Sequence, residues 1–302
     1  MRLFVTGATG WVGSAVVPEL LSAGHEVVGL ARSDASAAAL AAAGAEPLRG
    51  SLDDLDVLRA GAGAADGVIH LAFIHDFERI ADSGPVDRRA IETLADALAG
   101  SGKPLLVTSG TAGAAPGRVS TEADAGDPDG PARHRLGGER AALAAVERGV
   151  RAVVVRLPPT VHGAGDHGFV PALVAAARAA GAAGYVGDGA NRWAAVHRGD
   201  AARLYRLAVE AAPAGSVLHA VGEEGVPTRA IAEAIGRGLG LPTESISPAD
   251  VQERLGWIGG FFALDVPSSS ARTRELLGWE PSGPTLLEDL AGESYFAEAA
   301  VR

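Results

Sequence analysis

A glycine-rich turn at the start of the chain constrains the fold more than any other stretch of the sequence. Residues 1–13 read MRLFVTGATGWVG, in which the apolar run Leu3–Val5 is followed by glycines at positions 7, 10 and 13. An apolar pattern with helical spacing, Val12, Val16 and Leu20, begins directly afterwards. A buried strand, a tight glycine turn and a helix N-terminus together form the arrangement that binds the pyrophosphate of a dinucleotide. The segment therefore predicts a dinucleotide-binding β-α-β unit.

Each of the three glycines has its own predicted role. Gly7 takes the positive φ angle that the turn requires, which a side chain would disfavour. Gly10 lets the backbone approach the phosphates, and Gly13 lets the helix lie close to the strand.

The N-terminal half alternates short apolar runs with helical patterns, which is typical of a parallel sheet with helices on both faces. The expected strands are Arg2–Val5, Glu26–Leu30, Glu46–Arg49, Gly67–Leu71, Pro104–Thr108 and Arg151–Arg156. The expected helices between them are Val12–Ser22, Ala35–Ala43, Asp53–Ala60, Pro85–Ala99 and Arg135–Arg148. The fold class predicted is α/β, with a doubly wound parallel Rossmann-type sheet.

The second half predicts a smaller C-terminal substrate lobe, because the strict alternation ends after Arg156. Thr111–Arg133 is a long loop, Gly163–Gly168 is a glycine-rich loop, and Gly184–Trp193 is expected to be irregular. The remaining expected elements are a strand at Val217–Val221 and helices at Phe169–Ala180, Gly199–Ala211, Pro227–Leu239, Ala271–Leu277 and Thr285–Ala297. The predicted domains are a dinucleotide-binding domain at 1–157 and a lobe at 158–302, with about 195–221 returning to the first domain.

The composition argues against several classes of function. The net charge of −11 disfavours a surface for nucleic acid or for an anionic membrane. The chain has no cysteine, and no His-x-x-x-His or HExxH spacing occurs, so no metal site is predicted. No apolar run reaches the roughly 18 residues that span a bilayer, and a strand begins at the N-terminus without room for a signal peptide. A cytoplasmic protein that acts on a small-molecule substrate is expected.

The end of the second expected strand indicates which dinucleotide is bound. A site for NAD places a carboxylate there, to accept a hydrogen bond from the ribose 2′-hydroxyl. Arg32 and Ser33 occupy that place here, and a guanidinium pairs well with a 2′-phosphate. NADP(H) is therefore predicted, with NAD(H) as the less favoured cofactor because Asp34 follows closely.

Four further motifs follow the glycine loop: VIHLA at 68–72, RLPPTVHG at 156–163, AVHRGDA at 195–201 and RELLGWEP at 274–281. In this order they resemble the motifs of the extended short-chain dehydrogenase/reductase superfamily, the NAD-dependent epimerase/dehydratases, over nearly the whole chain. With the glycine loop and the second strand, the resemblance implies cofactor contacts at Gly7, Thr9, Gly10, Trp11, Val12, Gly13, Arg32, Ser33, Ser51, Leu52, Leu71, Ala72, Phe73, Thr108 and Pro158. It also implies a homodimer through a four-helix contact of Pro85–Ala99 and Arg135–Arg148.

The catalytic centre departs from the pattern of this superfamily. Its members use a Tyr-x-x-x-Lys pair on the helix after the fifth strand, with a Ser or Thr at that strand's end. No tyrosine lies between residues 105 and 155 here. If Glu139 is the glutamate that usually follows the lysine, Pro131 stands at the tyrosine position and Arg135 at the lysine position. An atypical member is therefore expected.

Two hydroxyls and an arginine are candidates for the catalytic work. Ser109 and Thr111 lie at or beside the place of the usual Ser or Thr, and either could hydrogen-bond a substrate carbonyl. Capping a turn is an equally good interpretation of these hydroxyls. Arg135 could hold a fixed positive charge at the ribose, but its pKa is too high for a proton donor.

A histidine is the better candidate for the proton source. His75 follows the fourth strand, and His162 takes the tyrosine position of the motif that ends the sixth strand. These two rank before His134 and His167, while His70 is expected to be structural.

The leading hypothesis is an NADP(H)-binding oxidoreductase that acts on a carbonyl or alcohol substrate without the usual Tyr-x-x-x-Lys pair. A redox sensor or partner-binding protein that binds NADP without catalysis is the alternative, as is an epimerase or lyase that uses bound cofactor transiently. The apolar residues expected around the substrate are Phe73, Phe77, Trp193, Trp257, Phe261 and Phe262.

Overall fold

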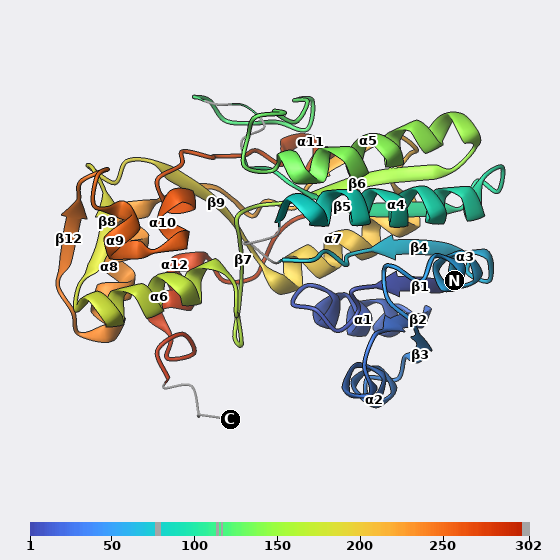
Figure 1. Cartoon of the computed structure of the whole chain (residues 1–302), viewed down its shortest axis with the longest axis horizontal. Coiled ribbons are helices and arrows are strands. Elements are labelled where there is room, and N and C mark those ends of the chain that lie inside the picture. Colours follow the sequence, from blue (N-terminus) through green and yellow to red (C-terminus); the bar gives the residue numbers. More distant parts are fainter. Residues whose placement is uncertain (76–79, 113–114, 116, 298–302) are drawn as a thin grey trace.

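A seven-stranded parallel sheet forms the centre of the larger lobe in this computed structural model, which describes residues 1–75, 80–112, 115 and 117–297 (Figure 1). The strand order is β10-β6-β5-β4-β1-β2-β3. The strands are β1 (Arg2–Thr6), β2 (Glu26–Ala31), β3 (Glu46–Arg49), β4 (Gly67–His70), β5 (Pro104–Gly110), β6 (Arg151–Leu157) and β10 (Val217–His219). The predicted α/β class with a doubly wound parallel sheet is confirmed. The order reverses between β1 and β4, which is where such sheets bind ligands.

Helices cover both faces of this sheet, as the apolar strands require. Leu3 and Val5 of β1 point to one face, where they pack with α1 (Gly13–Ser22), α2 (Asp34–Ala42) and α7 (Arg198–Ala211). Phe4 points to the other face, which is covered by α3 (Leu55–Gly63), α4 (Ile80–Leu98) and α5 (Leu136–Ala144). Short 3₁₀ turns flank α5 at Arg133–Arg135 and Ala145–Arg148.

The smaller lobe has its own core and two small sheets, beside the larger lobe in Figure 1. The first sheet has the order β11-β9-β7, and the second pairs β12 with β8 in parallel. The strands are β7 (Thr160–His162), β8 (Ala183–Val186), β9 (Arg192–His197), β11 (Glu223–Pro227) and β12 (Thr243–Ile246). The helices of this lobe are α6 (Phe169–Ala180), α8 (Thr228–Leu239), α9 (Val251–Leu255), α10 (Trp257–Phe262) and α12 (Leu286–Ala291), and α11 (Ala271–Leu277) packs against α7 and β10.

Two expected elements of the smaller lobe are wrong. Gly184–Trp193 is not irregular, because β8 and the start of β9 lie within it and find partners far along the chain. The expected helix Thr285–Ala297 ends at Ala291, where Gly292 takes an extended conformation. Its start at Thr285 is well defined by a capping box with Glu288.

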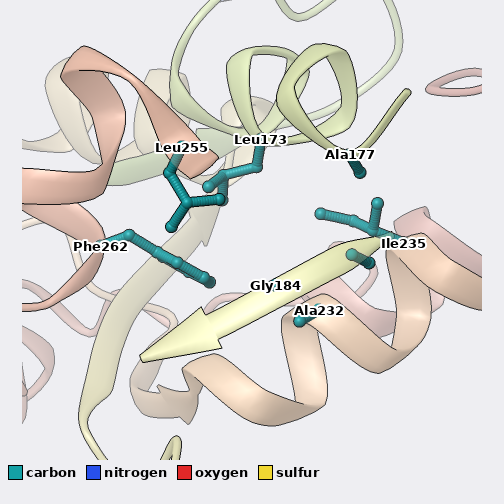
Figure 2. Close-up of a pocket in the computed structure, with 8 residues that line it drawn as sticks. Leu173, Ala177, Gly184, Ala232, Ile235, Leu255 and Phe262 are labelled. Carbon is teal, nitrogen blue, oxygen red and sulfur yellow. The ribbon is translucent and has the colours of Figure 1, made fainter. Parts of the chain in front are cut away.

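An apolar cavity of about 10 Å³ lies in the core of the smaller lobe (Figure 2). Leu173, Leu255 and Phe262 are among the side chains that line it. The volume is no larger than the space that one water molecule needs. The cavity is therefore a packing defect and not a place for a substrate. Among the helices that the structure describes, none has the length and apolar character needed to cross a membrane.

Candidate functional site

The loop between β1 and α1 is built on close approaches between backbone atoms. Gly7 has a φ of 67°, and a Cβ added there would lie 2.6 Å from the backbone nitrogen of Ala72, just after β4. A Cβ at Gly13 would lie 2.1 Å from the carbonyl oxygen of Gly7, and one at Gly10 would lie 3.1 Å from the same oxygen. Side chains are excluded at positions 7 and 13 and barely fit at position 10.

The start of α1 has the features of an anion site. Thr9 and Gly10 are exposed, and Val12 precedes the helix without a side-chain cap. No acidic residue lies in the first turn of this ten-residue helix. The N-terminal N–H groups and the helix dipole therefore favour a negative group next to the glycine loop. This cradle fits the pyrophosphate of a dinucleotide.

Arg32 and Ser33 follow β2, whose neighbour β1 leads into this cradle. The Ser33 hydroxyl caps α2 by accepting from the backbone N–H of Ser36 at 3.1 Å. Asp34 lies 3.1 Å from the guanidinium of Arg49. Arg32 is exposed, and within the described part of the chain nothing forms a hydrogen bond or ion pair with its guanidinium.

The turn after β3 is held by a carboxylate. Both the backbone N–H and the hydroxyl of Ser51 donate to Asp54, at 2.7 and 2.8 Å. Ser51 and Leu52 are thereby held at the carboxyl edge of the sheet, half-buried, and stay predicted cofactor contacts.

A buried polar network supports the ends of β4 and β5. His70 is fully buried, with Nε2 donating to Asp87 at 3.1 Å and Nδ1 at 2.8 Å from the hydroxyl of Thr6. The Thr108 hydroxyl donates to the carbonyl oxygen of His70, so it accepts from the Tyr205 hydroxyl 2.8 Å away. The Thr108 hydroxyl therefore already donates one hydrogen bond and accepts another within the protein.

Arg135 lies across the ends of these two strands. Its Nη2 donates to the carbonyl oxygen of Thr108, and its Cζ lies 3.9 Å from the centre of the Phe73 ring. Its Nη1 lies 3.9 Å from Asp87, too far for a hydrogen bond. Burial lowers the pKa of Arg135, and the charge of Asp87 opposes this shift. A positive charge is thereby held at the carboxyl edge of the sheet.

Several buried polar atoms at this edge have no hydrogen-bond partner in the described part of the chain. They are the hydroxyl oxygens of Ser109 and Thr111, Nη1 of Arg135 and Oδ2 of Asp87. Ser109 is 4% exposed and Thr111 is 1% exposed. Buried polar atoms in proteins are nearly always hydrogen-bonded. A group of such atoms at one strand end therefore indicates a place where a polar ligand atom completes the bonding.

His75 lies near this group. It follows Phe73 by two residues, and the two rings meet edge to face at 5.1 Å. The side chain reaches solvent, yet the surrounding protein lowers its pKa through burial, and the positive charge of Arg135 lowers it further. The charges of Asp87 and His167 also act on it. The structure thus brings His75 and Arg135, from two separate segments, to the same Phe73 ring.

Val161 of β7 and His167 of the loop 163–168 contact Trp11 of the glycine loop, which joins the smaller lobe to that loop. The Trp11 indole donates to the carbonyl oxygen of Val161 at 2.7 Å, and its ring lies 5.6 Å from that of His167. The guanidinium of Arg198 lies 4.1 Å from the centre of the Trp11 ring. Trp11 is therefore both part of the predicted cofactor loop and a contact between the lobes.

The other candidate histidines include His134 and His162, and the Nε2 atom of each is buried without a hydrogen-bond partner in the described part of the chain. His162 is fully buried in β7, with Nδ1 2.6 Å from Asp289 and its ring 5.7 Å from that of His197. Burial lowers its pKa although Asp289 opposes this. His134 packs its backbone against Gly84 of α4.

The remaining predicted residues take defined places at the same edge. Leu71 and Ala72 follow β4 and are half-buried, and Pro158 is buried just after β6. The backbone N–H of Thr111 donates to the carbonyl oxygen of Leu157 at 2.9 Å, which keeps Thr111 beside Pro158. Phe77 lies outside the described residues.

Sequence reasoning did not select Asp87 or Tyr205, although both form hydrogen bonds that support residues of the candidate site. Asp87 supports His70 and faces Arg135, and Tyr205 supports Thr108. Both come from helices, and only the predicted burial of His70 hinted that a buried partner must exist. Among the residues that the structure describes, no three His, Asp or Glu side chains are grouped to hold a metal ion.

These features are those of a dinucleotide-binding protein whose candidate site lies at the carboxyl edge of a doubly wound sheet. The profile of the NAD dependent epimerase/dehydratase family matches residues 3–220. The chain belongs to this family, and the resemblance inferred from its motifs is confirmed. The family is one of NAD-dependent epimerases and dehydratases, so the chain is an NAD(P)-dependent enzyme of oxidoreductase type.

Relatives of the same length are found in two yeasts. The chain is 48% identical to the uncharacterized protein C2A9.02 of Schizosaccharomyces pombe, over 98% of this chain and 100% of that protein. It is also 48% identical to protein YLL056C of Saccharomyces cerevisiae, over 96% and 98%. The dTDP-glucose 4,6-dehydratase DesIV of Streptomyces venezuelae, solved with NAD bound, has a similar fold, with a TM-score of 0.78, 21% identity and coverage of 98% and 96%.

Gly13→Ala should weaken NADPH binding at least about tenfold and lower the free energy of unfolding by about 1–3 kcal/mol, because its Cβ would push against the oxygen of Gly7. Fluorescence titration with NADPH and urea unfolding measure the two effects. Gly63→Ala is the matched control, since a Cβ there meets nothing within 4 Å. Unchanged NADPH binding in Gly13→Ala would show that the loop does not hold the cofactor.

Proposed function

We propose that this chain is an NADP(H)-dependent oxidoreductase that transfers a hydride between its cofactor and a carbonyl or alcohol carbon, without the Tyr-x-x-x-Lys pair. The observation that carries the proposal is the pair of buried, unpartnered hydroxyls of Ser109 and Thr111 at the end of β5. Hydroxyls in this state are ready to donate to a substrate oxygen. A small-molecule substrate and a cytoplasmic location stay predictions.

The positions of the basic residues support chemistry without the usual pair. The chain contains a single lysine, Lys103, which precedes β5 and donates to the carbonyl oxygen of Ala65 at 2.7 Å. It therefore lies at the edge of the sheet opposite the candidate site. Arg135 stands instead at the position that the resemblance gives to the lysine. A guanidinium keeps its charge but does not exchange protons near neutral pH.

Each group at the site has its own role in the proposed carbonyl reduction. The cofactor, when bound, supplies the hydride. Ser109 or Thr111 donates a hydrogen bond to the substrate oxygen, and Arg135 contributes a positive charge where negative charge develops. His75 gives a proton to that oxygen in the reduction and takes it back in the oxidation. The network of His70, Asp87 and Thr108 holds these groups in place.

One characterised relative supports a reductase. The chain is 29% identical over 195 residues to a ketoreductase of Stigmatella aurantiaca that is named for a farnesylated dihydroquinoline oxide, covering 59% of this chain and 55% of that protein.

The alternative, an NADP-binding sensor, is favoured by the missing Tyr-x-x-x-Lys pair. Incubation of the protein with NADPH and a panel of ketones and aldehydes separates the two. NADPH consumption supports the reductase, whereas stabilising NADP binding without consumption of NADPH by any compound supports the sensor.

Arg32 supports NADP over NAD, because its exposed guanidinium has no partner among the described residues while Asp34 is paired with Arg49. Arg32→Ala should raise the Kd for NADPH about 10- to 100-fold, as expected for a charge-assisted bond of about 1.5–3 kcal/mol. The Kd for NADH should stay unchanged. Titration of both cofactors measures this, with the exposed Arg59→Ala as control. Tighter binding of NADH than of NADPH by the unmodified protein would contradict the proposal.

His75 should set the pH dependence of the reaction. Its pKa is lowered from 6.5 by burial and by Arg135, so the neutral form prevails at pH 7. Reduction needs the protonated form, so its rate should rise as the pH falls through this lowered pKa. Oxidation of the alcohol should show the opposite trend. His75→Gln should lose both trends, while His25→Gln, whose ring contacts Glu210 at 2.9 Å, keeps them. A pH profile that survives in His75→Gln would assign the proton to another group.

The face of α4 and α5 supports a homodimer. A groove of about 410 Å³ runs along it, lined by small residues and by charges of both signs: Arg88, Glu92, Ala95, Gly137, Arg140, Ala141, Ala144, Ala145 and Arg148. A twofold axis would set this face against its own copy, where arginines and Glu92 complement each other. Ala144 is exposed, so Ala144→Glu should fold. Sedimentation equilibrium should give twice 30.4 kDa for the unmodified protein and for Ala38→Glu, but a monomer for Ala144→Glu.

A further inference from the structure

A tyrosine near the end of the described chain is bonded to the loop 163–168. Tyr295 follows α12 and is buried in the core of the smaller lobe. Its hydroxyl accepts from the backbone N–H of Gly163 at 3.0 Å and donates to the carboxylate of Asp166 at 3.1 Å. These bonds join residues that are 132 and 129 positions apart in the chain. One buried hydroxyl therefore fixes two points of the loop.

The carboxylate of Asp166 completes the bonding of this loop. Its other oxygen accepts from the backbone N–H of Gly168 at 2.7 Å. The backbone N–H of Asp166 donates in turn to the carbonyl oxygen of Gly163 at 3.2 Å. We call these bonds among Tyr295, Asp166, Gly163 and Gly168 the latch. The latch holds the loop at its first residue, at its last residue and between them.

The segment that carries Tyr295 is itself fixed to the smaller lobe. Arg178 of α6 donates to the carbonyl oxygen of Phe296 at 2.6 Å, and Phe296 packs against the core of this lobe. Asp289 of α12 lies 2.6 Å from Nδ1 of His162, the residue before the loop. The Tyr295 hydroxyl is thus placed by its neighbours, so little further side-chain entropy is lost when it holds the loop.

The latched loop contacts the glycine loop through Trp11. The ring of His167, in the loop, lies 5.6 Å from the Trp11 ring. The Trp11 indole also donates to the carbonyl oxygen of Val161, two residues before the loop, at 2.7 Å. Trp11 lies between Gly10 and Gly13, within the predicted pyrophosphate cradle. A change in the position of the loop therefore acts on a residue of the cradle.

Holding this contact affects binding even without a direct contact to the ligand. A ligand binds only the conformation of its site that is competent, so its apparent affinity falls with the fraction of the protein in that conformation. A set of bonds that keeps Trp11 in place raises that fraction. The latch is therefore able to strengthen cofactor binding from the far end of the chain.

We propose that Tyr295 and Asp166 are positioning residues for the nicotinamide cofactor. Through the loop 163–168 they hold Trp11, and with it the glycine loop, in the conformation that binds the dinucleotide. The inference rests on the glycine loop as the cofactor site and goes beyond the proposed hydride transfer, which it does not require.

Tyr295→Phe tests the latch, because it keeps the ring in the core and removes only the hydroxyl. The Kd for NADPH should rise about 5- to 10-fold, as expected for one lost hydrogen bond to a charged group. The melting temperature should fall by no more than about 4 °C. Fluorescence titration and thermal unfolding measure the two effects. Tyr185→Phe is the matched control, since Tyr185 is partly buried in the same lobe, and its Kd should stay within about twofold.

Two further variants test the carboxylate. Asp166→Asn keeps an oxygen that accepts from the Gly168 N–H, so it should raise the Kd for NADPH less than Asp166→Ala does. Equal Kd values for Asp166→Ala and the unmodified protein would overturn the inference, as would an unchanged Kd in Tyr295→Phe.

A double-mutant cycle tests the route through Trp11. Trp11→Leu should raise the Kd for NADPH by itself. In this background Tyr295→Phe should change the Kd by less than about twofold, because the loop no longer holds an indole. A residue that supports only the stability of the fold would give effects that add. Additive effects of the two substitutions on the Kd would therefore overturn the inference.

Binding and turnover separate this inference from the proposed function. The expected rise in Kd in Tyr295→Phe, with no carbonyl compound reduced by the unmodified protein, would support the latch and overturn the oxidoreductase. Reduction of a carbonyl compound, with the same Kd in Tyr295→Phe as in the unmodified protein, would overturn the latch and leave the oxidoreductase in place. Binding of neither NADPH nor NADH to the unmodified protein would overturn both.

Discussion

The contact between the start of α1 and the carbonyl oxygen of Gly7 is the constraint on which the rest of the site depends. It exists only because Gly13 has no side chain, since a Cβ there would lie 2.1 Å from that oxygen. The same loop touches the end of β4 at Ala72, where Gly7 leaves no room for a side chain either. The helix N-terminus, the ends of β1 and β4 and the residues that follow β4 are thus held at fixed distances from one another. The predicted phosphate site at the helix and the candidate residues near Phe73 are therefore held relative to each other by one structure.

The second layer of the candidate site is a polar network of fixed charge and hydrogen bonds. Arg135 bridges the ends of β4 and β5 and holds a positive charge beside the unpartnered hydroxyls of Ser109 and Thr111. Asp87 balances this charge and at the same time supports His70. Because neither the arginine nor the hydroxyls exchange protons readily near neutral pH, proton transfer falls to His75 in the proposed reaction.

The sequence predicted the larger lobe well because its signals are local. The strands of the central sheet lie within one or two residues of the predicted ranges, since each is a short apolar run that is buried on both faces. Prediction failed at Gly184–Trp193, because β8 and β9 become strands only by pairing with β12, β7 and β11. It also failed at the end of α12, where Gly292 leaves the helix although the apolar pattern continues.

By itself the sequence determined the doubly wound fold, the glycine loop and the lack of a tyrosine between residues 105 and 155, because each of these can be read from residues that are close together in the chain. The tertiary structure alone decided which candidates meet. It placed His75 and Arg135 against the same Phe73 ring and buried His162 beside Asp289 and His197. It also decided that Asp87 and Tyr205, on distant helices, support the strand ends. Burial and contact between segments far apart in the chain depend on how the elements pack, which no local pattern records.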